Sequence, residues 1–256
     1  MTGRVTILVD GSPFALVVPA VLLDFLSTAE DYNLNNQYSN FLRIIRVISL
    51  FFALFLPGLY VAITNFHQEL LPSELLFAIS GARESIPFPI IFEIIIMEIS
   101  FELIREAHLR VPSPFGQTIG IIGALILGEA SVNASIVSPI LIIVIAFTGI
   151  CSFAIPDFSF AFSIRIFRFF YIIGGFLAGF LGIGFVFFIQ FALLCRLNSF
   201  GVSYLSPYLP FNEKKNFPFY YVNPIWKKER RNDFLKTKRP FEEDLISMNW
   251  RKNGKK

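Results

Sequence analysis

An apolar stretch from Pro87 to Ala107 is interrupted by ionisable side chains, which are the best candidates in this chain for chemistry. Four of them, Glu98, Glu102, Arg105 and Glu106, fall within an arc of about 100° on a helix, while Glu93 points nearly the opposite way. Ionisable groups at membrane depth are costly and usually serve an ion or substrate path. The four residues, called the charged stripe below, are therefore the candidate ion pathway.

Two environments for the charged stripe remain open at this stage. The stretch is either an amphipathic helix in the membrane interface with solvated charges, or a helix that lines an aqueous vestibule. One carboxylate at the bilayer centre costs roughly 2.5–3.5 kcal/mol, so several cannot face lipid together. Glu102 with Arg105, and Glu106 with Arg110, have the spacing of i,i+3 and i,i+4 ion pairs.

Other chemistry has little basis in the residues. The sequence contains no HExxH, no GxSxG, no Walker loop and no cluster of Cys and His. His67 and His108 are isolated, and both Cys151 and Cys195 lie in apolar segments as packing residues. We expect no enzymatic activity, no cofactor and no metal site.

The elements that must position the stripe are membrane helices. The 256-residue chain is 54% hydrophobic, has 32 Phe and is only 16% charged, against about 25% charged residues in soluble domains. Apolar segments long enough to span a bilayer are predicted at 44–64, 117–134, 138–154 and 167–195. The predicted fold is an all-α polytopic membrane protein with about four transmembrane helices, one amphipathic re-entrant or interfacial helix at 87–107, and a short N-terminal β-hairpin.

The number of spans follows from the basic residues. Arg43 and Arg46 precede the first span, and if they share the cytoplasm with the basic tail the number of spans is even. Four spans leave 87–107 entering and leaving on one face. A five-span alternative has that segment crossing. Arg165 and Arg168 are expected on the non-cytoplasmic side in either case, against the positive-inside rule.

Three regions are predicted. Residues 1–42 contain a hairpin with an Asp10-Gly11 turn and resemble the end of a truncated soluble domain, because such a hairpin is marginal alone. Residues 43–196 form the transmembrane domain. Residues 197–256 form a basic cytoplasmic tail, in which 13 Lys and Arg stand against 6 Asp and Glu from Asn212 onward. Candidate contacts to anionic lipid headgroups are Lys214, Lys215, Lys227, Lys228, Arg230 and Arg231.

Small residues recur every four positions in two of the predicted spans. Such rows let helix backbones approach closely in lipid, so they predict helix packing. The alternative for the first row is a face lining a conduction path. The first row is Gly116, Gly120, Ala124 and Gly128, and the second is Gly174, Ala178 and Gly182.

The chain resembles the A subunit of the GerA family of spore germinant receptors. The resemblance runs nearly end to end to about Phe211 and is very specific from Pro87 to Pro139. The residues that carry it are Gly3-Arg4-Val5 to Phe14, Pro87-Phe88-Pro89, Phe101-Glu102-Leu103-Ile104-Arg105-Glu106-Ala107, Gly120-Ile121-Ile122-Gly123-Ala124, Val137-Ser138-Pro139 and Tyr204-Leu205-Ser206-Pro207.

This resemblance implies a multi-pass subunit of a nutrient receptor in the spore inner membrane, with its C-terminus cytoplasmic. It implies a transporter-like B subunit and a lipoprotein C subunit as partners, assembly into a homo-oligomer, and a ligand-gated ion channel; no nucleic acid is expected. Family A subunits begin with a sizeable soluble region, and this chain is expected to start near its end. Two alternatives are a secondary transporter subunit, for which no internal repeat is visible, and a truncated, non-conducting scaffold.

Overall fold

The computed structural model describes residues 4–12, 15–110, 120, 123, 125 and 127–208. The described chain separates into two compact units. The first comprises Met1–Val47 with Ile189–Lys256, and the second is Ile48–Phe188. The long helices α1 (Asn36–Phe66) and α6 (Phe158–Arg196) each contribute residues to both units.

The first unit contains the predicted N-terminal hairpin. Strand β1 (Val5–Leu8) pairs antiparallel with β2 (Ala15–Val18), in a register that sets Val5 opposite Val18. Two short 3-10 helices, η1 (Leu22–Leu26) and η2 (Ala29–Tyr32), follow. A second small ribbon of β3 (Asn198–Ser199) and β4 (Val202–Ser203) joins this region through a hydrogen bond from Leu22 N to Tyr204 O.

Within the first unit, the buried carboxylate of Asp31 joins η2 to the beginning of α1. Asp31 accepts hydrogen bonds from Arg46 at 2.6 and 3.0 Å and lies 3.5 Å from the guanidinium of Arg43. Thr28 donates a further bond through its hydroxyl at 2.9 Å. Burial by itself raises the pKa of Asp31, but the bonds from Arg46 and Thr28 outweigh it and hold the pKa below its usual value of 3.8.

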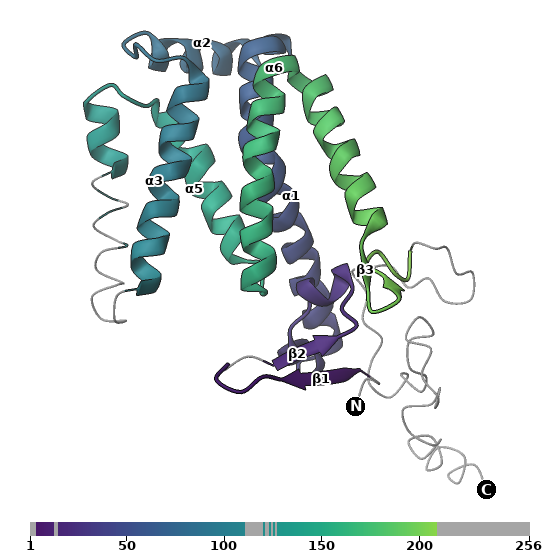
Figure 1. Cartoon of the computed structure of the whole chain (residues 1–256). Coiled ribbons are helices and arrows are strands. Elements are labelled where there is room, and N and C mark those ends of the chain that lie inside the picture. Colours follow the sequence, from purple (N-terminus) through teal and green to yellow (C-terminus); the bar gives the residue numbers. More distant parts are fainter. Residues whose placement is uncertain are drawn as a thin grey trace, which may run out of the picture. The chain divides into compact units, whose positions relative to one another are not determined.

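The second unit is helical (Figure 1). It contains the C-terminal part of α1, then η3 (Gln68–Leu70), α2 (Ser73–Arg83), α3 (Ile90–Arg110), α5 (Pro139–Phe153) and most of α6. Ser138 caps the N-terminus of α5 by accepting a bond from Leu141 N, and Pro139 occupies the first turn, where a missing N–H costs nothing. Helix α2 lies between the predicted span at 44–64 and the predicted segment at 87–107.

Helix α6 is not one continuous helix, which corrects the prediction of a single span at 167–195. Ala178 and Gly179 have non-helical backbone angles, and Gly179 adopts a positive φ of 59° that favours glycine. Residues 158–177 and 180–196 are therefore two helical arms. The arms fold back on each other, because a Cβ at Gly174 would lie 3.0 Å from the carbonyl oxygen of Gly182.

Glycine also brings α1 and α6 together. A Cβ built on Gly175 would lie 2.5 Å from the carbonyl oxygen of Gly58, and one on Gly58 would lie 2.8 Å from that of Tyr171. Only glycine permits this backbone approach at both positions. We call Gly58, Gly174, Gly175 and Gly182 the glycine joint.

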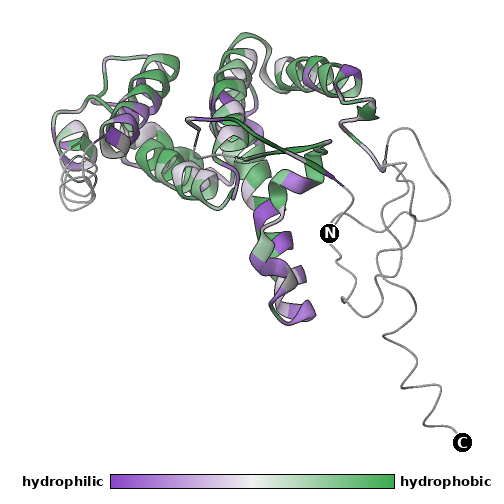
Figure 2. Cartoon of the chain, turned by 60° about the horizontal axis from the view of Figure 1, so that its bottom comes forward, coloured by the Kyte–Doolittle hydropathy of each residue, from purple (hydrophilic) through white to green (hydrophobic). Residues whose placement is uncertain are grey.

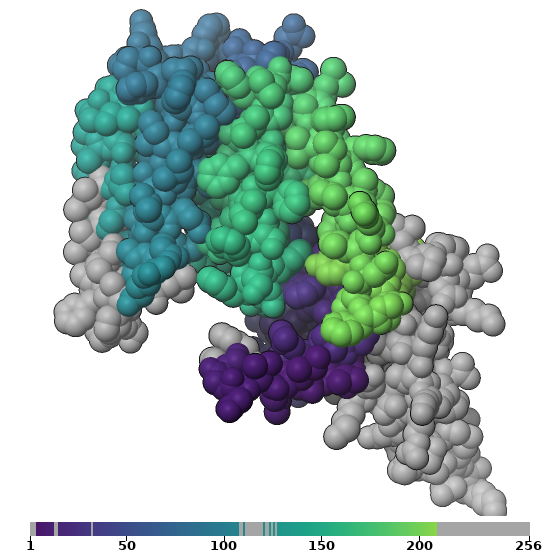
Figure 3. Space-filling model, in the orientation of Figure 1, coloured from purple at the N-terminus to yellow at the C-terminus, as the bar shows by residue number. Residues whose placement is uncertain are grey.

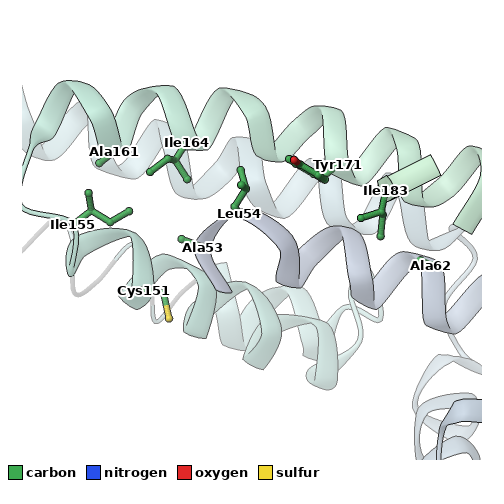
Figure 4. Packing of buried hydrophobic residues seen from close by; sticks show 9 residues of the cluster. All are labelled: Ala53, Leu54, Ala62, Cys151, Ile155, Ala161, Ile164, Tyr171 and Ile183. Carbon is green, nitrogen blue, oxygen red and sulfur yellow. The ribbon is translucent and has the colours of Figure 1, made fainter. Parts of the chain in front are cut away.

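Two buried apolar clusters fill the second unit. One joins α1, α5 and α6 around the fully buried Tyr171, with Ala53 and Leu54 from α1 and Cys151 from α5 (Figure 4). The other joins α3 to the same helices. Its members are Val61, Ile90, Ile94, Met97, Val137, Leu141, Ile145 and Ile172.

Hydrophobic residues predominate along the long helices (Figure 2). Helices α1 and α6 are each long and apolar enough to cross a membrane, and only 28% of the most apolar 18-residue segment of α6 is buried within the chain. The core helix of a soluble protein would be mostly covered by protein. The exposed apolar surface of α6 therefore requires lipid or another protein against it.

Candidate functional site

Arginines from α6 meet the charged stripe of α3 inside the second unit. Arg168 donates to Glu98 at 2.8 Å, and both side chains are sealed, with 4% and 5% exposure. One turn further along, Arg165 donates to Glu102 at 2.9 Å. The residue numbers of the paired side chains increase along α3 and decrease along α6, so α3 and the first arm of α6 run antiparallel. Their side chains lie next to each other in Figure 3.

We call these two interhelical pairs, together with Arg105, the ion-pair ladder. Arg105 donates to Glu102 at 3.2 Å and to the hydroxyl of Ser152 on α5 at 3.2 Å. Arg168 also donates to the backbone carbonyl of Ala53 on α1 at 2.7 Å. The ladder thus connects four helices through side chains that are largely removed from solvent.

Aromatic rings supply further contacts to the arginines. The guanidinium of Arg105 lies 4.8 Å from the ring centroid of Phe153, and that of Arg165 lies 5.7 and 5.4 Å from those of Phe158 and Phe162. Such cation–π contacts are worth about 2 kcal/mol when desolvated. They lower the cost of holding arginine among apolar side chains.

Glu93 forms a separate buried junction on the other side of α3. Its side chain is 1% exposed, accepts from Arg83 of α2 at 3.2 Å and from the backbone N–H of Ser138 at 3.1 Å. Glu93 therefore ties α2, α3 and the start of α5 together. Its direction, opposite to the stripe, agrees with the helical-wheel prediction.

The environment of the charged stripe differs from both environments that the sequence predicts. Neither solvated interfacial charges nor a vestibule describes Glu98, because its partner is the buried Arg168. Arg165 and Arg168 are both buried within α6, and the side of the membrane on which they lie stays a prediction. The sequence did contain a signal for this pairing. Arg165 and Arg168 lie three residues apart in one apolar segment, and Glu98 and Glu102 lie four residues apart in another.

The remaining predicted charges lie at the end of α3. Glu106 pairs with Arg110 at 2.6 Å, and both are exposed. The predicted i,i+3 and i,i+4 pairs are thus confirmed. Whether the stripe conducts ions stays a prediction.

The two rows of small residues fare differently. Gly174 and Gly182 lie in the glycine joint, and Ala178 lies at the break in α6. Gly120 and Gly128 are helical, and a Cβ at Gly128 would meet no atom of the described residues within 4 Å. Gly116 and Ala124 fall outside the described residues, as do the headgroup candidates Lys214, Lys215, Lys227, Lys228, Arg230 and Arg231.

Metal binding has no visible site in the described part of the chain. No three His, Cys, Asp or Glu side chains there form a group that would hold a metal ion. The arrangement offers ion pairing and helix coupling. It offers no nucleophile with an adjacent base among the ladder residues.

Comparison with known proteins defines the class. Residues 1–234 match the family described as Bacillus/Clostridium GerA spore germination protein. The chain belongs to this family.

Individual relatives agree with the family assignment. Spore germination protein KA of Bacillus subtilis is 42% identical over 90% of this chain and 42% of its own length. Spore germination protein GerLA of Bacillus cereus is 43% identical over 81% of this chain and 42% of its length, and spore germination protein A1 of B. subtilis is 42% identical over 80% and 42%. The chain thus spans less than half the length of these relatives. No solved structure matches it.

Proposed function

We propose that this chain acts in the membrane as the A-type subunit of a germinant receptor, the complex through which a dormant spore responds to nutrients. The observation that carries the proposal is the family match over residues 1–234. The exposed apolar surfaces of α1 and α6 support a bilayer as the surroundings. The resemblance adds the spore inner membrane as the site of action, and a transporter-like B subunit and a lipoprotein C subunit as partners.

The proposed topology differs from four spans. Helix α3 has 21 residues, about 30 Å at 1.5 Å per residue, which matches the hydrocarbon thickness. Its charges no longer forbid crossing, because Glu98 and Glu102 are paired with arginines of α6. Each arm of α6 then forms one pass. With α5 and the span that the sequence predicts at 117–134, the chain makes six passes, an even number that keeps Arg43, Arg46 and the tail in the cytoplasm.

Conduction of ions is the finer part of the proposal. Several copies of the chain form a channel, and the carboxylates of α3 attract cations toward it. The Glu102 side chain is 40% exposed, and a Cβ on Gly128 would meet no described atom within 4 Å, which supports a face available to neighbouring copies. We do not expect enzymatic activity or a cofactor.

The break in α6 favours one alternative, a secondary transporter subunit, because discontinuous helices line transporter sites. A non-conducting scaffold is the other. Reconstitution of the purified chain in liposomes separates these, with mass measurement for assembly and passive cation flux for conduction. Gradient-coupled uptake without passive flux would favour the transporter, and neither activity would favour the scaffold.

The receptor role has its own test in spores. Deleting the gene in the host should abolish germination in response to at least one nutrient in an amino-acid and sugar panel. Reintroducing the gene should restore the response. Unchanged responses to the full panel, in a strain without other receptors of the family, would contradict the proposal.

A further inference from the structure

Glu102 is shared between arginines of two different helices. Its Oε1 accepts from Arg165 of α6 at 2.9 Å, and its Oε2 accepts from Arg105 of α3 itself at 3.2 Å. The Glu102 side chain is 40% exposed, whereas those of the two arginines are 7% and 12% exposed. One accessible carboxylate thus serves two nearly sealed guanidinium groups.

The other rung of the ladder has no such freedom. Glu98 and Arg168 are sealed on both sides, and Arg168 is further fixed by the carbonyl of Ala53. Breaking a buried pair strands a charge at a cost of about 3–5 kcal/mol. The Glu98–Arg168 pair therefore keeps α3 in contact with α6 when the pairing of Glu102 changes.

Both arginines keep other contacts when Glu102 leaves them. Arg165 also donates to the carbonyl of Ala161 at 3.3 Å and lies over Phe158 and Phe162. Arg105 also donates to Ser152. Each guanidinium therefore keeps a hydrogen-bond acceptor when Glu102 moves away. Moving Glu102 from one arginine to the other costs much less free energy than breaking the buried Glu98–Arg168 pair.

We propose that Glu102 is the exchange point of a latch between α3 and α6, with Arg165 as the positioning residue that keeps the latch closed. In the closed form Glu102 bridges the two helices. In the released form it pairs with Arg105 alone, α3 separates from α6 at this level, and the carboxylate faces the ion path. The inference rests on the proposed conduction and names its control point.

Two substitutions separate the latch from simple electrostatics. Arg165→Gln and Arg105→Gln each remove one positive charge beside Glu102, so a vestibule that responds only to local charge predicts a change of the same direction in both. The latch predicts opposite directions. Arg165→Gln should raise resting cation flux by about tenfold, the effect of one lost charge-assisted hydrogen bond, while Arg105→Gln should leave it at or below the parent level.

The experiment uses the full chain in liposomes with potassium as the probe ion. Arg165→Lys should restore flux toward the parent value, because an ammonium still reaches the carboxylate. Glu74→Gln, at an exposed position of α2 outside the charged stripe, is the control and should match the parent. Equal changes of one sign for both arginine variants would overturn the latch while leaving conduction intact.

A distance measurement tests the latch without conduction. Spin labels at Leu103 and Ile166, both exposed, report the separation of α3 and α6. Arg165→Gln should add a population with a longer distance that Arg105→Gln lacks. An unchanged distribution would overturn the latch, whereas a longer population in a chain that carries no current would retain the latch movement and reject the channel.

Discussion

At the scale of single residues, Arg168 is the most constrained side chain of the ladder. It donates to a carboxylate on α3 and to a backbone carbonyl on α1, and only 3% of the residue is exposed. A guanidinium suits this position because its several donors reach two acceptors in different directions. Lysine has no such planar geometry.

The first prediction concerns the cost of breaking this pair. Arg168→Gln should lower the free energy of unfolding by about 3–5 kcal/mol, because Glu98 is left buried without its counter-charge. The double variant Glu98→Gln, Arg168→Gln should be less damaged than the single, since no charge is stranded. Unfolding in detergent micelles followed by circular dichroism measures both.

Arg110→Gln is the matched control for that series. Arg110 also pairs with a glutamate but is 78% exposed, so its loss should cost no more than about 1 kcal/mol. A double variant that is less stable than Arg168→Gln would contradict the stranded-charge explanation.

The second prediction concerns Asp31, outside the membrane helices. Its pKa is lowered in the folded chain, so unfolding takes up a proton at low pH. The stability contributed by this carboxylate should be complete above pH about 4 and should decline as pH falls through the lowered folded pKa. Unfolding temperatures measured from pH 6 to pH 2 would show the decline.

Asp31→Asn removes the titrating group and should flatten this part of the pH profile at a lower overall stability. Asp10→Asn, at an exposed position in the hairpin turn, should leave the parent profile unchanged. A profile for Asp31→Asn that parallels the parent below pH 4 would assign the decline to another group.

At the scale of elements, the glycine joint determines how α6 folds. A 39-residue apolar helix would extend well beyond a bilayer of about 30 Å. The break at Ala178 and Gly179 divides it into two arms, and the glycines allow these arms and α1 to approach at backbone distance. Within the row of Gly174, Ala178 and Gly182, the first and last residues therefore pack against each other, and Ala178 lies at the turn between them.

The third prediction tests the joint with one added methyl group. Gly175→Ala should destabilise the chain by about 1–3 kcal/mol, because its Cβ would overlap the carbonyl of Gly58. Gly184→Ala on the second arm is the control, since an added Cβ there would have no atom of the described part of the chain within 4 Å, and it should be neutral or slightly stabilising. Equal unfolding midpoints for the two variants would contradict the close approach.

At the scale of the whole molecule, the proposed six-pass topology depends on which helix ends lie together. The turn of α6 lies against the end of α1, because a Cβ on Gly179 would meet the ring of His67 at 2.8 Å. Both features therefore belong to one side of the second unit. The proposed six-pass topology assigns this side to the face opposite the cytoplasm.

The fourth prediction is the sidedness of single cysteines. Cysteines at Glu69, Ser85 and Leu177 should react with an impermeant reagent from one side of the membrane. Glu69 follows the end of α1, Ser85 precedes the start of α3 and Leu177 ends the first arm of α6, and the proposed topology assigns these three helix ends to one side. Cysteines at Arg110 and Ser159 should react from the other side. Inverted and right-side-out vesicles provide the two conditions.

The background for this test lacks Cys151 and Cys195. Labelling of Ser85 and Arg110 from the same side would restore the interfacial interpretation of α3 and the four-span count. Labelling of Leu177 from the side of Ser159 would mean that α6 does not turn back within the membrane.

The sequence alone predicted the long apolar helices, the family, the N-terminal hairpin and the start of α5, because these depend on composition, local turn chemistry and short motifs. The pairs Glu102–Arg105 and Glu106–Arg110 were also predictable, since helical geometry sets their spacing. The opposed direction of Glu93 followed from the same periodicity.

Only the tertiary structure decided which partners the charges take. Glu98 and Arg168 are 70 residues apart, and nothing local brings them together. The break in α6 was equally hidden, because Gly179 lies among glycines that periodicity assigns to one helix, and its positive φ becomes favourable through packing against α1. Long-range contacts therefore place part of a stripe expected to face water, above all Glu98, in ion pairs between helices.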